Sequence, residues 1–206
     1  DPVADGPVIQ RANLQAIDNG MTVVKLFEQI AEMREKITIP VVIMSSLNPI
    51  LQYGMEAFCE SCSRVGIDGL ILPDLPIDVY ESEYKSLFEK NGMSNILLVT
   101  PTTPESRIRD IDSKSKGFIY QVSSSSITGA KGQFSEEQVA YFKRVQSLNL
   151  STPNLIGFGI SDEQTFNEAC QYAKGGIIGS AFVKALKQEG DRDENISYFI
   201  KEIIKS

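Results

Sequence analysis

The stretch LIGFGISDEQTFNEACQYAKGGIIGSAFVKAL, residues 155–186, contains two short apolar runs that each lead into a glycine turn. Gly159 lies in the first turn, and the pair Gly179-Ser180 forms the second. A helical pattern of apolar residues follows each turn. We therefore expect two successive units in which a buried strand leads directly into a helix.

These two turns are candidates for a phosphate-binding site. Glycine lets a ligand approach the backbone closely, and the first turn of a helix offers unpaired N–H groups and the positive end of the helix dipole. In a parallel barrel, phosphate usually binds in the loops after strands seven and eight. The alternative is that each glycine only shapes a tight turn. The pair, together with the hydroxyl of Ser180, favours phosphate, whereas either turn alone favours the alternative.

The rest of the chain alternates short apolar runs with helical patterns. Continuously apolar runs are typical of strands that are buried on both faces of a parallel sheet. The runs lie at residues 39–44, 69–72, 95–100, 117–122, 154–158 and 175–178. The helix starts carry the cap pairs Asp78 with Glu81, Thr103 with Pro104-Glu105, Ser135 with Gln138, and Ser161 with Gln164. We predict an α/β fold, with a closed eight-stranded barrel and an open doubly wound sheet as the two candidates.

Length and composition indicate one compact domain over residues 1–206. The formal net charge of -7 and the pI of about 4.8 argue against nucleic acid or anionic membrane as a partner, since no basic run is present. Apolar runs of about six residues are far too short to span a bilayer. We expect a soluble protein of the cytoplasm.

Histidine is absent from the sequence, which excludes histidine acid/base catalysis and Ser-His-Asp triads. Cys59 and Cys62 share a helical stripe with Met55, Phe58 and Val65. This spacing favours packing in the core over a metal or redox site.

The segment SSSSITGAKGQ, residues 123–133, follows one of the predicted strands. A long loop of small residues at this position is suited to a lid over an active site. On composition alone, an exposed connector is an equally good interpretation.

Several motifs together resemble the tryptophan synthase alpha-subunit family of (β/α)8 TIM barrels, and the resemblance covers the chain from end to end. The first motif, Asp1-Pro2-Val3-Ala4-Asp5-Gly6-Pro7, matches the family's loop after strand two in all but that loop's first residue. The others are Asn48-Pro49-Ile50 with Tyr53-Gly54, Asp74-Leu75-Pro76, Thr128-Gly129, Gly157-Phe158-Gly159-Ile160-Ser161 and Gly179-Ser180-Ala181.

The resemblance implies a lyase that cleaves indole-3-glycerol phosphate to indole and glyceraldehyde 3-phosphate. Asp5 is then the catalytic carboxylate beside the indole N–H, where it stabilises the cationic indolenine electrostatically. Substrate contacts are implied for Tyr120, Thr128 and Phe158. Phosphate contacts are implied for Gly129, Gly159, Gly179 and Ser180.

The resemblance also implies a partner, a tryptophan synthase beta subunit, in an alpha2beta2 heterotetramer. The family's contact face matches Asp1, Pro2, Asn48, Asp74 and Pro76. Pyridoxal phosphate is expected only in the beta subunit, so no cofactor and no metal are expected in this chain.

The chemistry of the residues agrees with this activity. A retro-aldol cleavage usually needs a lysine Schiff base or a zinc ion as electron sink. The predicted strand ends carry neither option, since their residues are Ser46, Asp74, Thr100, Ser123, Gly157 and Gly179. An indole ring protonated at C3 is its own electron sink, so carboxylates are sufficient.

The chain also departs from the family. The family has two further strands and a helix before the position of Asp1, with a glutamate that acts as acid/base. The 206 residues are therefore expected to cover strands three to eight of an N-terminally incomplete barrel and to be inactive alone. Ser46 also stands where family members often have tyrosine.

Two other functions remain open at this point. Another phosphosugar barrel enzyme, such as an isomerase, would share the phosphate site but would not need the loop of residues 1–7. A non-catalytic partner that activates a beta subunit would need only the residues of the contact face and no catalytic residues. Turnover of indole-3-glycerol phosphate, with and without a beta subunit, separates the three.

Overall fold

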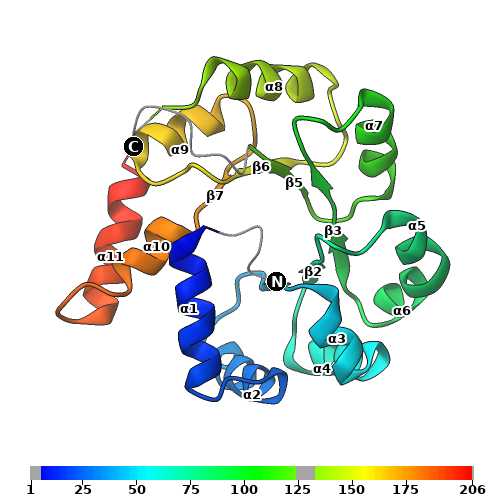
Figure 1. Ribbon diagram of the computed structural model, residues 1–206, viewed down its shortest axis with the longest axis vertical. Coiled ribbons are helices and arrows are strands. Elements are labelled where there is room, and N and C mark those ends of the chain that lie inside the picture. Colours follow the sequence, from blue (N-terminus) through cyan, green and yellow to red (C-terminus); the bar gives the residue numbers. More distant parts are fainter. Residues whose placement is uncertain (1–5, 124–132, 206) are drawn as a thin grey trace. The chain divides into compact units, whose positions relative to one another are not determined.

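The computed structural model describes residues 6–123 and 133–205 and has the alternating order of strands and helices expected of an α/β protein (Figure 1). Every strand pair in these residues is parallel. The predicted α/β class with parallel strands is confirmed. Within the same ranges, no helix has both the length and the apolar character needed to cross a bilayer.

The chain forms two compact units, which are described separately. Of the described residues, the first unit consists of Gln15–Leu97 and Ser115–Gly117, and the second contains 6–14, Leu98–Lys114, 118–123 and 133–205. Helix α1 (Pro7–Asp18) begins in the second unit and ends in the first. The expectation of a single domain stays a prediction.

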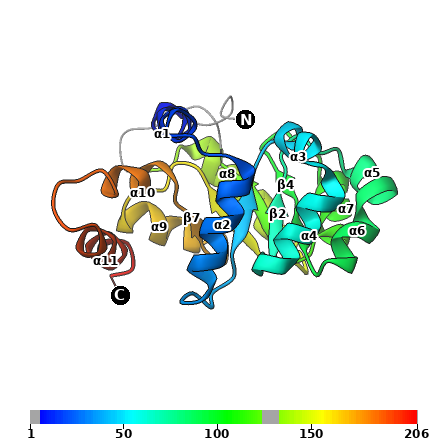
Figure 2. The ribbon, with the colours of Figure 1, turned by 90° about the horizontal axis from the view of Figure 1, so that it is seen from below.

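The first unit contains a three-stranded sheet in the order β1-β2-β3. Its central strand β2 is buried along its whole length, and its register places Leu70 beside Ile43 on one side and Asn95 on the other. The elements of this unit are α2 (Val23–Arg34), β1 (Val42–Met44), α3 (Leu47–Tyr53), α4 (Met55–Val65), β2 (Gly69–Ile71), α5 (Ile77–Val79), a π-helical turn (Tyr80–Tyr84), α6 (Lys85–Lys90) and β3 (Ser94–Ile96). Helices α4 and α6 pack against each other (Figure 2).

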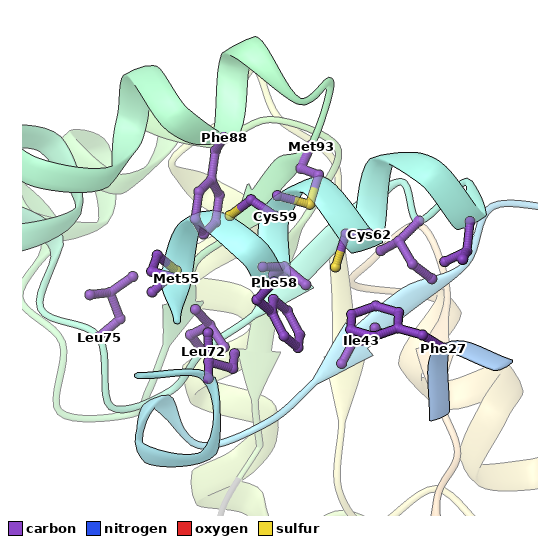
Figure 3. Packing of buried hydrophobic residues seen from close by; sticks show 14 of the residues in the cluster. Phe27, Ile43, Met55, Phe58, Cys59, Cys62, Leu72, Leu75, Phe88 and Met93 are labelled. Atoms are coloured by element: carbon purple, nitrogen blue, oxygen red, sulfur yellow. The ribbon is translucent and has the colours of Figure 1, made fainter. Parts of the chain in front are cut away.

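The thiols of Cys59 and Cys62 lie in the apolar core of this unit (Figure 3). Both residues are 0% exposed, and Phe58 beside them packs on Phe27 of α2 with ring centroids 5.2 Å apart. Burial raises the pKa of each thiol to about 12, so both stay protonated at neutral pH. The prediction that these cysteines pack in the core is confirmed.

The second unit contains a four-stranded sheet in the order β4-β5-β6-β7. Its elements are β4 (Leu98–Val99), α7 (Glu105–Lys114), β5 (Ile119–Val122), α8 (Glu136–Ser147), β6 (Asn154–Gly157), α9 (Glu163–Cys170), β7 (Gly176–Ile177), α10 (Ser180–Ala185) and α11 (Arg192–Ile203). Arg144 of α8 ties down the loop after β4, because its guanidinium donates to the carbonyl oxygens of Pro101 at 2.8 Å and Thr103 at 3.0 Å.

Asp112 of α7 fixes the loop that precedes β6. Its carboxylate accepts hydrogen bonds from the backbone N–H groups of Ser151 at 2.9 Å and Thr152 at 2.7 Å. Burial alone would raise the pKa of Asp112, but the hydrogen bonds from both residues outweigh it and hold that pKa below its usual value.

Two predictions about the strands are wrong in detail. The run at residues 95–100 forms two strands rather than one, because β3 pairs with β2 in one sheet while β4 pairs with β5 in the other, and Leu97 lies between them. Met44 is 47% exposed although its run was predicted to be buried on both faces. Its strand β1 is at the edge of the three-stranded sheet and has one neighbour there.

The predicted helix caps have mixed outcomes. Ser135 and Gln138 form the predicted capping box at α8. The cap at Asp78 is wrong, because α5 begins after Pro76 and Asp78 lies within it. Helix α7 begins at Glu105, while the hydroxyl of Thr103 accepts a hydrogen bond from the N–H of Thr100.

Candidate active site

The carboxyl ends of the four strands β4 to β7 meet at one edge of their sheet, because all of them run parallel. The register Val122↔Gly157 brings the end of β5 to the end of β6, and the register Gly157↔Ile177 brings β6 to β7. The turns that follow β6 and β7 therefore lie next to each other and beside the end of β5. This edge is where an α/β sheet binds its ligands.

Tyr120 of β5 lies directly against the backbone of Gly157. A Cβ added at Gly157 would lie 2.3 Å from the phenol oxygen of Tyr120, a distance that no real side chain tolerates. The ring of Tyr120 also meets the ring of Phe158 in an edge-on arrangement, with centroids 6.3 Å apart. The two predicted substrate contacts, Tyr120 and Phe158, are thus brought together, and Gly157 provides the space for them.

The turn after β6 is left-handed at two successive residues. Phe158 has a φ of 69° and Gly159 a φ of 83°. Gly159 is exposed at the surface, whereas Phe158 is half-buried. Gly159 is therefore the more accessible of these two residues to a ligand.

The predicted capping box of Ser161 with Gln164 is wrong, because the helix begins one residue later. Asp162 is the N-cap of α9, and its carboxylate accepts from the N–H of Thr165 at 2.9 Å. The hydroxyl of Thr165 accepts in turn from the N–H groups of Ser161 at 3.0 Å and Asp162 at 3.2 Å. Aspartate and serine are about equally favoured as N-caps, and here the reciprocal bonds between Asp162 and Thr165 place the cap at Asp162.

The cap at α9 limits where an anion can bind. Burial alone would raise the pKa of Asp162, but its hydrogen bonds with Thr165 and Ser161 outweigh this and keep that pKa below its usual value. The helix start therefore carries a negative charge already. Of this turn, only the residues around Gly159 remain suited to phosphate.

The second glycine turn leads into α10. Gly179 is the N-cap residue of this helix and Ser180 its first residue. A Cβ at Gly179 would lie 3.1 Å from Cδ1 of Ile9 in α1, so the backbone here is closely packed. The first N–H groups of a helix have no partner within it, and here the hydroxyl of Ser180 stands beside them.

In the first unit, Asp74 joins the loops that follow β1 and β2. Both of its carboxylate oxygens lie 2.9 Å from the N–H of Leu47, the first residue of α3. The N-cap residue Ser46 makes no side-chain hydrogen bond to the helix, so Asp74 supplies the cap from the next loop. Asn48, Asp74 and Pro76, the predicted partner contacts, are all exposed.

Five of the predicted site residues lie outside the described part of the chain. They are Asp1, Pro2, Asp5, Thr128 and Gly129. Their assignments stay predictions.

Sequence reasoning missed two roles at this edge of the second unit. Gly157 was recognised as part of a turn, yet its close contact with Tyr120 depends on the register of β5 and β6. Ser123 was named as the end of a strand, and the structure shows it fully buried with its hydroxyl donating to the carbonyl oxygen of Phe158 at 2.8 Å. The run of serines beginning at Ser123 was the only signal, and composition does not show which of them is buried.

Comparison with known proteins identifies the family. The family model described as "Tryptophan synthase alpha chain" matches residues 1–205. The tryptophan synthase alpha chain of Flavobacterium johnsoniae is 55% identical over 203 residues, which are 98% of this chain and 79% of that protein. The alpha chain of Christiangramia forsetii is 54% identical over 98% of this chain and 78% of its own length.

Solved structures agree with the sequence relatives. The tryptophan synthase A-subunit from Pyrococcus furiosus superposes with a TM-score of 0.87 at 27% identity, covering 100% of this chain and 83% of that one. A structure of the tryptophan synthase complex from the same organism gives a TM-score of 0.86 at 26% identity, with the same coverage. The predicted (β/α)8 TIM-barrel class is confirmed as the fold of this family, while the assignment to strands three to eight stays a prediction. The chain belongs to the tryptophan synthase alpha chain family.

Proposed function

We infer that this chain is a carbon-carbon lyase of tryptophan biosynthesis, which cleaves indole-3-glycerol phosphate to indole and glyceraldehyde 3-phosphate. The match of the family model over residues 1–205 is the observation that carries this inference. The arrangement of the second unit supports it, because an aromatic pair and two glycine turns lie at one edge of a parallel sheet.

The reaction needs one proton delivered and one removed. A proton added at C3 of the indole makes a cationic indolenine, and loss of the adjacent glycerol hydroxyl proton then drives cleavage of the carbon-carbon bond. The bonding electrons return to the ring, which leaves neutral indole and the aldehyde. We propose that Asp5 stabilises the cationic ring through its charge beside the indole N–H.

The substrate's two ends fit the two kinds of surface at this edge. We propose that the indole packs on Phe158 and Tyr120, whose rings already lie in contact. The phosphate is proposed to bind Gly159, Gly179 and Ser180, supported by the exposed turn at Gly159 and the start of α10. Thr128 and Gly129 complete the substrate and phosphate contacts in this proposal.

The partner is a tryptophan synthase beta subunit, to which this chain hands its indole. We propose that Asp1, Pro2, Asn48, Asp74 and Pro76 form the contact and that the assembly is an alpha2beta2 heterotetramer. The described members of this set support the proposal, since Asn48 in the first turn of α3 and Pro76 after β2 are exposed, and Asp74 bonds the start of α3.

We further propose that the chain uses no cofactor of its own, because the protonated indole ring accepts the electrons that a Schiff base or metal would otherwise take. Pyridoxal phosphate belongs to the beta subunit in this proposal. A cytoplasmic location and a single barrel domain over residues 1–206 are also proposed, the location on the free thiols of Cys59, Cys62 and Cys170.

The test is the release of indole from indole-3-glycerol phosphate, measured on the full-length protein with and without a beta subunit. Asp5→Asn should lower the rate by about 10²-fold or more and leave the affinity for glycerol 3-phosphate unchanged. Asp18→Asn, at the exposed end of α1, is the matched control and should behave as wild type.

Each alternative function gives its own result. Rearrangement of a phosphosugar without indole release would indicate an isomerase. Activation of a beta subunit without any turnover would indicate a non-catalytic partner. Wild-type turnover in the Asp5→Asn protein would refute the role of Asp5.

A further inference from the structure

The turn after β6 contains an unusual backbone conformation. Among the described residues other than glycine, Asn149 and Phe158 have positive φ, at 47° and 69°. Asparagine adopts this left-handed region readily, whereas a bulky aromatic residue does so only where its surroundings impose it. Phe158 must therefore be held by neighbouring groups.

Ser123 is the residue that reaches this turn from the neighbouring strand. It follows β5 directly, is 0% exposed, and makes two hydrogen bonds across to the turn. Its N–H donates to the carbonyl oxygen of Gly157 at 3.0 Å, and its hydroxyl donates to the carbonyl oxygen of Phe158 at 2.8 Å. The first bond continues the sheet, whereas the second fixes the peptide that joins Phe158 to Gly159.

The hydroxyl also lies close to the next residue of the turn. A Cβ at Gly159 would lie 3.9 Å from Oγ of Ser123 and 3.3 Å from Cε1 of Phe134. The carbonyl of Phe158 thus points to Ser123 while the amide of Gly159, on the same peptide, points away from it. A rotation of this peptide would redirect that amide, whereas the peptide before Phe158, which carries the carbonyl of Gly157, governs the place of the ring and is held by the N–H of Ser123.

We infer that Ser123 is a positioning residue. Its hydroxyl holds the Phe158–Gly159 peptide and so aims the phosphate-binding amide, while its N–H holds the peptide before Phe158 and so places the indole-packing ring. This inference rests on the proposed function for the roles of Phe158 and Gly159. Ser123 itself touches no substrate in it. A purely structural role, in which the hydroxyl only satisfies a buried carbonyl, would affect stability alone.

The experiment compares Ser123→Ala with Ser61→Ala. Ser61 is the matched control, because it is also buried, at 4% exposed, and its hydroxyl bonds with Tyr53 at 3.3 Å and Arg64 at 3.0 Å in the first unit. Loss of the hydroxyl bond of Ser123 should raise KM for indole-3-glycerol phosphate about tenfold and leave kcat nearly unchanged, since the phosphate that the Gly159 amide is proposed to bind does not change in the reaction. Ser61→Ala should lower the unfolding temperature without changing either constant.

Hydrogen exchange of the peptide covering residues 155–162 gives a second measurement that does not depend on turnover. Ser123→Ala should speed exchange there, and Ser61→Ala should not. Ser123→Thr keeps the hydroxyl and should restore both KM and slow exchange. If Ser123→Ala cannot be purified folded, Ser123→Cys, whose thiol is a weak donor, should show the same changes to a smaller degree.

Unchanged KM and unchanged exchange in the Ser123 variants would overturn the inference. A full-length wild-type protein that releases no indole would refute the proposed function instead. In that case the hydrogen-exchange measurement, which does not depend on turnover, would still test whether Ser123 positions the turn.

Discussion

The core of the first unit and the turns of the second are packed in opposite ways. In the core, side chains such as Phe58 and Cys59 fill the space between α4 and its neighbours to 1% and 0% exposure. At the turn after β6, the side chain is missing at Gly157, and the phenol of Tyr120 occupies its place. Removing atoms from the core of the first unit should therefore lower the stability of the protein. Adding atoms at the turn of the second unit should lower its catalytic activity.

The largest expected effect is in the core. Phe58→Ala should lower the free energy of unfolding by about 3–5 kcal/mol, because it leaves a cavity beside Phe27 and removes buried apolar area. Urea unfolding measures the loss. Activity per folded molecule should stay the same, and Cys170→Ala on the surface should change neither property.

Gly157→Ala tests the turn by adding one methyl group. The new Cβ would lie within 2.5 Å of the phenol oxygen and two ring carbons of Tyr120, so the side chain must move, and kcat/KM should fall about 10²-fold. Gly69→Ala is the matched control in the first unit, where a Cβ would meet Cδ1 of Ile96 at 2.6 Å and the carbonyl oxygen of Ser94 at 2.8 Å. That variant should lose stability and keep its activity once folded; equal losses of activity in both would contradict the comparison.

Ser180→Asp tests the second glycine turn with a charge. A carboxylate at the start of α10 would repel the phosphate, and glycerol 3-phosphate should bind about tenfold more weakly by calorimetry. Ser135→Asp places the same charge at the N-cap of α8, where it should cap the helix and leave binding unchanged. Equal affinity in wild type and Ser180→Asp would mean that this turn only shapes the chain.

The smallest effect concerns Asp112 and depends on pH. The pKa of Asp112 is lowered in the folded state, so the charged carboxylate stabilises the fold. This stabilisation is complete when the pH is above the pKa of the unfolded chain, about 4, and is lost as the pH falls through the lower pKa of the folded state. Asp112→Asn should cost about 1 kcal/mol at pH 7, since the carboxylate is partly open to solvent. Urea unfolding at pH 7 and at about pH 3 should show that the difference in free energy of unfolding between Asp112→Asn and wild type is smaller at the acidic pH. An equal difference at both pH values would mean that the charge of Asp112 does not contribute.

The sequence was sufficient for features that depend on local pattern. The alternation of apolar runs and helices predicted the parallel α/β class, and the spacing of Ser135 and Gln138 predicted a cap that the structure contains. The stripe containing Cys59 and Cys62 predicted their burial.

Features that depend on contacts between strands could not be predicted in the same way. The division of the run at residues 95–100 follows from a change of sheet partner, which no local pattern records. The cap at Asp162 competed with one at Ser161, and the two candidates differ by a single position. The contact between Tyr120 and Gly157 requires the register of two strands, and the assignment of Asp5 came from family resemblance alone.

The bond from Asp74 to Leu47 matters for anyone who exchanges loops between members of this family. The loop after β2 carries the acceptor, while the helix after β1 supplies the donor and lacks a side-chain cap of its own. A graft of either segment alone would separate the two halves of one hydrogen bond and leave the start of α3 uncapped. Chimeras should therefore take residues 45–76 as a single cassette, in which case the donor and acceptor come from the same parent.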